Sequence, residues 1–178
     1  MPFDPDPRIV EILARLDETG FEGEVWKHTL PGQPPEAANT KGARWNPPDV
    51  PAIYVALERA TATAEGDHLV SMQPRPIRGA RTLHRGRVTL RRVLDLRDPI
   101  VLNGLGVGES ELSSADQSAC RQVGGAAEWL GFDGLIVPSA RGPGANLVIF
   151  ERRVVPDFEL LIAESSPIPE AGAGPPER

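Results

Sequence analysis

Apolar residues recur along the chain at two kinds of spacing, one typical of helices and one typical of strands. Spacings of three and four predict a first helix over residues 7–18, with one apolar face formed by Ile9, Ile12, Leu13 and Leu16. Two further helices are expected over residues 58–72 and 115–130, the second ending at Gly131. Residues 23–30 are expected to form a strand, short apolar runs predict buried strands over 52–57, 134–139 and 146–151, and alternation predicts one or two more over 85–96.

The order of these elements favours an α+β fold in which helices are inserted between short strands. Residues 1–20 are expected to form an N-terminal helical extension and residues 21–160 the main domain. A last edge strand can form over residues 154–162, and residues 104–110 are expected to be an irregular glycine-rich connection. The remaining segment, residues 161–178, is small, charged and rich in proline and glycine, which is typical of a disordered tail.

Composition narrows the classes of function. The chain has 178 residues and a formal net charge of −6, so nucleic acid is not expected as a direct partner. Apolar runs are too short to span a membrane, and the acidic, proline-rich start does not resemble a secretory signal, so we expect a cytoplasmic protein. The single cysteine, Cys120, and three widely spaced histidines give no ligand pattern, so no metal is expected.

The first segment that can carry chemistry spans residues 42–65 and contains Arg44, Tyr54 and Glu65. Arg44 can present a planar fork to a phosphate, or can simply lie on the surface over Trp45. Tyr54 can stack on a flat heterocycle, or can pack in the core with a satisfied hydroxyl group. Glu65 is either an ordinary solvated residue or a carboxylate set back among small residues and facing a cleft. Glu58, two helical turns earlier, is the decoy for that role.

The second segment spans residues 131–150 and places Ser139 at the end of an apolar strand, before a glycine-rich loop. Arg141 and Asn146 flank that loop, where strand ends commonly present binding groups. Ser139 can equally bond its own turn, and Asn146 can hold the turn together. No G-x-S-x-G elbow surrounds Ser139 and no histidine follows it, so a serine-hydrolase triad is poorly supported.

Two other sequence patterns do not indicate a functional site. The glycines of residues 104–108 are spaced too closely for a dinucleotide-binding fingerprint. A run of arginines over residues 81–92 is expected to be a solvated surface, with an acidic partner protein as the alternative.

Taken together, the two segments resemble the RES domain, a family named for an arginine, a glutamate and a serine. The resemblance covers roughly residues 20–155. It is carried in order by G-A-R-W-N at Arg44, A-I-Y-V-A at Tyr54, A-x-A-E ending at Glu65, G-F-D-G-L-I-V-P-S-A-R containing Ser139, and N-L-V-I-F beginning at Asn146. Family members often carry an early arginine after an aromatic residue, where this chain has Lys27 after Trp26.

The resemblance implies a mixed, split β-sheet similar to that of ADP-ribosyltransferase toxins, with residues 21–160 as the catalytic domain. It also implies that the chain is the toxin of a toxin–antitoxin pair, with NAD⁺ as substrate. The expected partner is an Xre-type helix-turn-helix antitoxin that covers the cleft.

The chemistry of NAD⁺ fits the residues that carry the resemblance. Nicotinamide leaves the ribose as a neutral ring, through a transition state that resembles an oxocarbenium ion. Glu65 can stabilise that positive charge, and Arg44 suits the phosphates. Tyr54 can stack on nicotinamide, and Ser139 can orient Glu65 or Arg44 without acting as a nucleophile.

The acceptor of ADP-ribose is left open by the sequence. Water needs no further group, whereas phosphate needs an extra cationic pocket, for which Lys27 and Arg141 are the candidates. A protein-modifying ADP-ribosyltransferase is one alternative, and a catalytically inert nucleotide- or partner-binding module is another.

Overall fold

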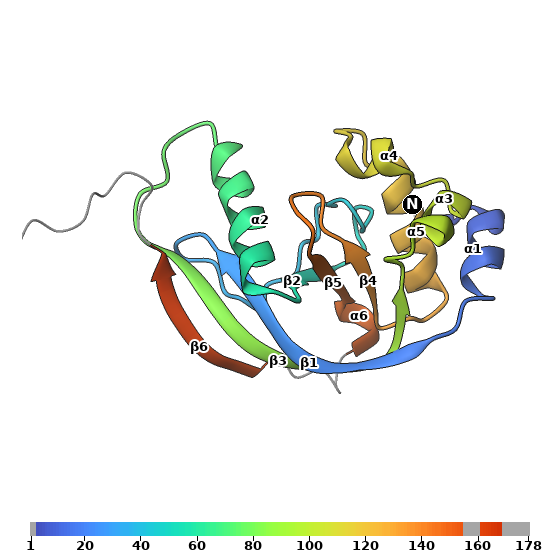
Figure 1. Ribbon diagram of the computed structural model, residues 1–178, viewed down its shortest axis with the longest axis horizontal. Coiled ribbons are helices and arrows are strands. Elements are labelled where there is room, and N and C mark those ends of the chain that lie inside the picture. The colour runs from blue at the N-terminus through green and yellow to red at the C-terminus, as the bar shows by residue number, and fades with distance from the viewer. Residues whose placement is uncertain (1–2, 155–160, 169–178) are drawn as a thin grey trace, which may run out of the picture.

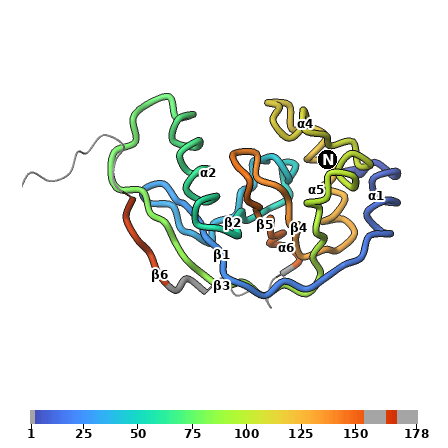
Figure 2. The backbone as a smooth tube through the Cα atoms, viewed as in Figure 1, coloured from blue at the N-terminus to red at the C-terminus, as the bar shows by residue number. Residues whose placement is uncertain are grey.

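The computed structural model describes residues 3–154 and 161–168 and has a mixed α+β architecture (Figures 1 and 2). The helices are α1 (Pro7–Leu13), α2 (Arg59–Ser71), α3 (Pro99–Gly104), α4 (Glu109–Ser113), α5 (Ser118–Trp129) and α6 (Glu151–Val154). The strands are β1 (Thr19–Thr29), β2 (Ala52–Ala56), β3 (Arg81–Asp95), β4 (Gly134–Pro138), β5 (Ala145–Phe150) and β6 (Leu161–Ile168). The expected α+β class is therefore confirmed.

The described strands form a six-stranded sheet in the order β1-β2-β5-β4-β3-β6, and β1 also pairs with β3. Strands β1 to β5 thus close on themselves, with β6 added at β3. The closure is uneven, because β1 pairs with β3 along most of its length but meets β2 at one register pair, Trp26 with Ala56. Figure 1 shows α2 on one side of β2, β5 and β4, and the α4–α5 region on the other.

Two apolar clusters lie on opposite faces of the central strands, because successive side chains of a strand point to opposite faces. Ile53 of β2, Leu147 of β5 and Ile136 of β4 pack with Val25 and Val88 on one face. The other face carries side chains of the same strands against helices α1, α3 and α5, and its fully buried members include Ala52, Leu135, Val148, Phe150, Val123 and Ala127.

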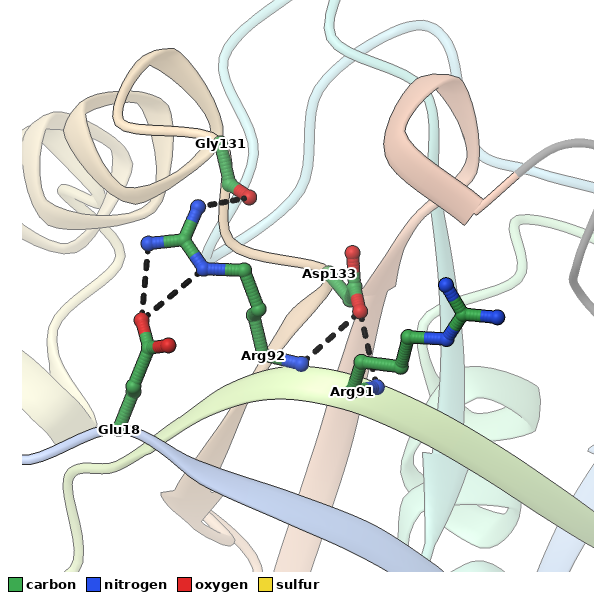
Figure 3. A network of polar contacts seen from close by, with 5 residues as sticks. All are labelled: Glu18, Arg91, Arg92, Gly131 and Asp133. Atoms are coloured by element: carbon green, nitrogen blue, oxygen red, sulfur yellow. Dashed lines mark hydrogen bonds and ion pairs between the residues drawn. The ribbon is translucent and has the colours of Figure 1, made fainter.

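A polar network ties three parts of the chain together near the start of β4 (Figure 3). The Arg92 guanidinium of β3 donates to Glu18 Oε2 at 2.8 and 2.9 Å and to the Gly131 carbonyl at 3.0 Å. Asp133 Oδ2 accepts the backbone N–H groups of Arg91 and Arg92, both at 2.9 Å. These bonds hold the end of α5 and the beginning of β4 against the long β1–β3 ribbon.

The arginine run of residues 81–92 is largely solvated, as expected, and four of its side chains are ion-paired. Arg85 pairs with Glu24, Arg87 with Glu22 and Arg92 with Glu18 across the β1–β3 ribbon, while Arg81 pairs with Asp67 of α2. Exposed pairs of this kind contribute at most about 1 kcal/mol each. The pairs do offset much of the positive charge of this run, which weighs against its use as a surface for an acidic partner.

Several element boundaries differ from the expectations. Helix α1 ends at Leu13, before the expected end at residue 18. Strand β3 is one 15-residue strand that begins at Arg81, before the segment 85–96 for which one or two strands were expected. The expected irregular connection of residues 104–110 contains the end of α3 and the start of α4.

The predicted disordered tail needs correction over residues 161–168. These residues form β6, which pairs antiparallel with β3 from Arg81 to Arg87. Proline and glycine counts suggested a tail, but the unpaired edge of β3 provides backbone partners that composition does not reveal. Residues 169–178 lie outside the described residues, as does most of the segment for which an edge strand over 154–162 was expected.

Candidate functional site

A cavity of about 460 Å³ lies where β1 and β2 diverge, and helix α2 and the loop before β2 form its walls. This volume is within the usual range for small-molecule sites. Six of the seven predicted site residues line it: Lys27, Arg44, Tyr54, Glu65, Arg141 and Asn146. The seventh, Ser139, is hydrogen-bonded to Glu65.

Glu65, Ser139 and Asn146 form one hydrogen-bonded cluster. Ser139 Oγ donates to Glu65 Oε1 at 2.6 Å, and Asn146 Nδ2 donates to the same oxygen at 2.9 Å. The backbone N–H of Arg141 in turn donates to Ser139 Oγ at 3.0 Å, which fixes the hydroxyl group. Two donors on Oε1 hold the carboxylate in one orientation and leave Oε2 without a hydrogen-bond partner among the described residues.

The close approach of α2 to β1 positions Glu65. Gly66 packs directly on His28, and a Cβ atom added there would lie 2.3 Å from the His28 ring. Ala62 and Thr61, one turn earlier, are also buried, so small side chains on this face bring α2 against the sheet. The small residues around Glu65 in the sequence therefore serve helix packing.

Glu58 has a structural environment that distinguishes it from Glu65. Its Oε2 atom accepts from Thr61 Oγ1 at 2.8 Å and from the Ala145 backbone N–H at 3.1 Å, joining the start of α2 to β5. Glu58 is not among the described residues that line the cavity. Glu65 therefore lines the cavity, whereas Glu58 makes a structural hydrogen bond that holds the start of α2 to β5.

Asn46 and Tyr54 organise the loop that carries Arg44. The Tyr54 hydroxyl donates to Asn46 Oδ1 at 2.7 Å and accepts the Trp45 backbone N–H at 3.0 Å. Asn46 is completely buried and donates to the carbonyls of Asn39 and Val50. Tyr54 therefore lines the cavity while its hydroxyl serves the loop, and burial raises the pKa of that hydroxyl.

Arg44 is anchored at the opposite wall of the cavity from α2, near α4. Its Nη1 atom donates to the carbonyls of Glu111 and Ser114, both at 3.2 Å. The guanidinium carries further N–H groups on Nε and Nη2, so this anchoring leaves donors for a ligand. Ser139 was expected to orient either Glu65 or Arg44, and its hydrogen bond goes to Glu65.

Lys27 and Arg141 add positive charge to the cavity. Burial lowers the pKa of Lys27 to about 8, with Glu36 acting in the opposite direction, and Nζ lies 3.4 Å from the Ala37 carbonyl. Arg141 has no ion pair with any other described residue. Together with Arg44, these cations outnumber the single lining carboxylate, Glu65, among the described residues.

Sequence reasoning missed several residues of the cavity wall. His28 of β1, His68 of α2 and Gln117 before α5 line it and stand in no recognisable motif, and Trp26, noted in the sequence only as the aromatic residue before Lys27, lines it too. Burial, followed by the charge of Arg81, lowers the pKa of His28. Trp26 and His28 lie two residues apart in β1, and this spacing could have indicated that both side chains are on the same face of the strand, toward α2.

No helix among the described residues is long and apolar enough to cross a membrane. No group of three histidine, cysteine, aspartate or glutamate side chains in the described part of the chain is arranged to hold a metal ion.

Comparison with known proteins identifies the family of the chain. The RES domain family model matches residues 13–169. The chain is 34% identical over 131 residues to proteins named NAD(+) phosphorylase MbcT of Mycobacterium bovis and Mycobacterium tuberculosis, a match covering 68% of this chain and 68% of each relative. The fold is similar to a chain in the crystal structure of the M. tuberculosis MbcT–MbcA toxin–antitoxin complex, with a TM-score of 0.77, 24% identity, and coverage of 92% of this chain and 93% of that one. The expected resemblance is thus confirmed, and the chain belongs to the RES domain family.

Proposed function

We propose that this protein is a toxin enzyme that cleaves the nicotinamide–ribose bond of NAD⁺ and transfers ADP-ribose to phosphate or water. The observation that carries the proposal is one carboxylate oxygen, Glu65 Oε1, held by both Ser139 and Asn146 beside a cavity lined by Lys27, Arg44 and Arg141. The name of the mycobacterial relatives, NAD(+) phosphorylase, supports the same reaction.

In the proposed reaction, the bond between ribose C1′ and the nicotinamide nitrogen breaks, and its electron pair neutralises the nicotinamide ring. Positive charge then develops on the ribose carbon and ring oxygen. Glu65 lies ready to stabilise this charge through Oε2, because Oε1 is occupied by its two donors. Ser139 and Asn146 act as positioning residues, since both reach the carboxylate and neither needs to form a covalent bond.

Phosphate is the acceptor that the charges of the cavity favour. Hydrogen phosphate forms a bond from oxygen to C1′ as neutral nicotinamide leaves, giving ADP-ribose 1″-phosphate with no net gain or loss of protons. Arg141 suits the phosphate, because its backbone is bonded to Ser139 next to Glu65. Lys27 is the second cation available for it. Water is the alternative nucleophile, giving ADP-ribose and a proton.

The test mixes purified protein with NAD⁺ in phosphate buffer and in phosphate-free buffer and identifies the products by mass spectrometry. We expect nicotinamide in both, with ADP-ribose 1″-phosphate only when phosphate is present. Intact NAD⁺ in both buffers contradicts the proposal, and bound but uncleaved NAD⁺ points to the inert binding module. Nicotinamide released only when an added bacterial lysate becomes ADP-ribosylated points to the protein-modifying alternative.

We further propose that an Xre-type helix-turn-helix antitoxin silences the enzyme by covering this cavity. The structural relative comes from a toxin–antitoxin complex, which supports a partner of this general kind. A carboxylate of the partner can occupy the place of the NAD⁺ phosphates, because Arg44 and Arg141 make the cavity cationic within an acidic protein.

A competition binding assay with NAD⁺ and the antitoxin tests this proposal. The antitoxin should raise the apparent dissociation constant for NAD⁺ in proportion to its own concentration. In cells without antitoxin, the wild-type chain should deplete NAD⁺ and slow growth, whereas Glu65→Gln should be tolerated. Simultaneous binding of NAD⁺ and antitoxin contradicts the shared site. We place this activity in the cytoplasm, where NAD⁺ is available, and fractionation of cells that express the natural gene tests that location.

A further inference from the structure

Gln117 lies on the cavity wall immediately before α5, and the proposed reaction assigns it no role. It is half-buried and makes no hydrogen bond to the free N–H groups at the start of the helix. Its side chain is thus not used as a helix cap, although it stands at the capping position. What it contacts instead determines which of its atoms a ligand would meet.

The orientation of the Gln117 amide is set by Arg121, one turn further along α5. Arg121 Nη2 lies 3.1 Å from Gln117 Oε1, and Arg121 Nε donates to the Ala43 carbonyl at 2.9 Å. A guanidinium group can only donate, so the amide oxygen must face Arg121. The Nε2 atom then points away from Arg121, and it has no hydrogen-bond partner among the described residues.

Arg121 links this amide to the loop that carries Arg44. Its second contact, the Ala43 carbonyl, belongs to the residue directly before Arg44. Arg44 and Gln117 both line the cavity, so this wall presents N–H donors from two side chains. Glu65, with its acceptor oxygen, stands on α2 at another wall.

We propose that Gln117 is a substrate-binding residue that donates its Nε2 hydrogens to the diphosphate of NAD⁺ beside Arg44, and that Arg121 is the positioning residue that holds it. Two side-chain donors on one wall, one of them cationic, suit a ligand group that only accepts, and the diphosphate is the part of NAD⁺ with that chemistry. This inference rests on the proposed function. With this contact, the diphosphate of NAD⁺ lies toward α5 and the nicotinamide ribose lies toward Glu65.

A glutamate at position 117 separates this role from a structural one. Gln117→Glu keeps an oxygen for Arg121 and adds an ion pair, but it replaces the N–H donors with a charge that repels phosphate. We expect an unchanged or higher melting temperature, an increase in the KM for NAD⁺ of about tenfold or more, and a kcat close to that of the wild type. Gln122→Glu is the matched control, because it adds the same charge on the same helix outside the described cavity lining.

The role of Arg121 is tested through Gln117. Arg121→Leu should raise KM in the wild-type background but should add little in a Gln117→Leu background, because its contribution passes through the amide. A merely structural arginine would lower the melting temperature and kcat equally in both backgrounds. Arg121→Lys should restore part of the KM, since lysine can still donate to Gln117 Oε1.

Direct binding distinguishes failure of this inference from failure of the proposed function. Isothermal titration of NAD⁺ and of ADP-ribose in a Glu65→Gln background avoids turnover, and it should show the same weakening when Gln117→Glu is added. A wild type that binds NAD⁺ without releasing nicotinamide overturns the proposed reaction and still tests this contact. Wild-type affinity and KM in Gln117→Glu overturn the assignment of Gln117, whatever the reaction.

Discussion

Ser139 and Glu65 lie 74 residues apart in the sequence, yet the serine hydroxyl donates a 2.6 Å hydrogen bond to Oε1 of the glutamate. The bond joins the end of β4 to the middle of α2. Because Asn146 of β5 donates to the same oxygen, three separate elements must pack correctly before this carboxylate takes its orientation. The cluster is therefore a product of the tertiary fold and a sensitive point for testing it.

Glu65→Gln should abolish most nicotinamide release, whereas Glu58→Gln should not. Removing a charge stabiliser of a transition state typically costs about 10²–10³-fold in kcat. Glu58 is bonded to Ala145 and Thr61 outside the described cavity lining, so its replacement should lower the melting temperature and leave turnover nearly intact. Steady-state kinetics and thermal unfolding on both variants check this, and equal activities would refute the assignment of Glu65.

Ser139→Ala should reduce kcat without abolishing the reaction, because the serine positions Glu65 and is not a nucleophile. A hydrogen bond to a charged group contributes about 1.5–3 kcal/mol, so a loss of about 10- to 100-fold is expected. Ser139 and Asn146 share one oxygen, so Ser139→Ala combined with Asn146→Ala should lose less than the product of the single effects. Complete loss of activity in Ser139→Ala, or a trapped ADP-ribosyl-serine, would contradict this role.

Lys27 should make substrate binding depend on pH in a range where most lysines do not titrate. Burial lowers its pKa to about 8, so its positive charge is present below that pH and is lost as the pH rises through it. If the cation holds a phosphate group, the KM for NAD⁺ or for phosphate should rise between about pH 7 and pH 9. Lys27→Arg keeps its charge throughout that range and should give a flat profile. The same rise in Lys27→Arg would assign the titration to another group.

Gly66→Ala should disturb the site through helix packing. A Cβ atom would meet the His28 ring at 2.3 Å, so α2 must move outward and carry Glu65 with it. Overpacking of this kind commonly costs about 1–3 kcal/mol of unfolding free energy, and kcat should fall as well. Gly104→Ala is the control, since nothing lies within 4 Å of its added Cβ. A His28→Ala change in the Gly66→Ala background should restore part of the stability, and its failure to do so would locate the strain elsewhere.

Most helices and strands could be predicted because their signals are local. The apolar runs that form β2, β4 and β5 and the alanine-rich segment of α2 were found close to their observed bounds. Strand β6 was missed because composition suggested a tail, and only pairing with the edge of β3 makes residues 161–168 a strand. The ion pairs of the arginine run could not be predicted for a related reason, since the carboxylate partners of Arg85, Arg87 and Arg92 are far away in the sequence.

The sequence by itself determined the family and the residues of its two motif segments, because the order and spacing of Arg44, Tyr54, Glu65 and Ser139 are local and readable. The resemblance already favoured Glu65 over Glu58, but only the tertiary structure gives the physical difference, since Glu58 at the N-cap of α2 bonds the backbone of β5 whereas Glu65 meets Ser139 at the end of β4. The tertiary structure also brought in Gln117 and His28, which no motif marks. Hydrogen bonds and close packing act between atoms that the closed sheet brings together, and separation along the chain does not reveal them.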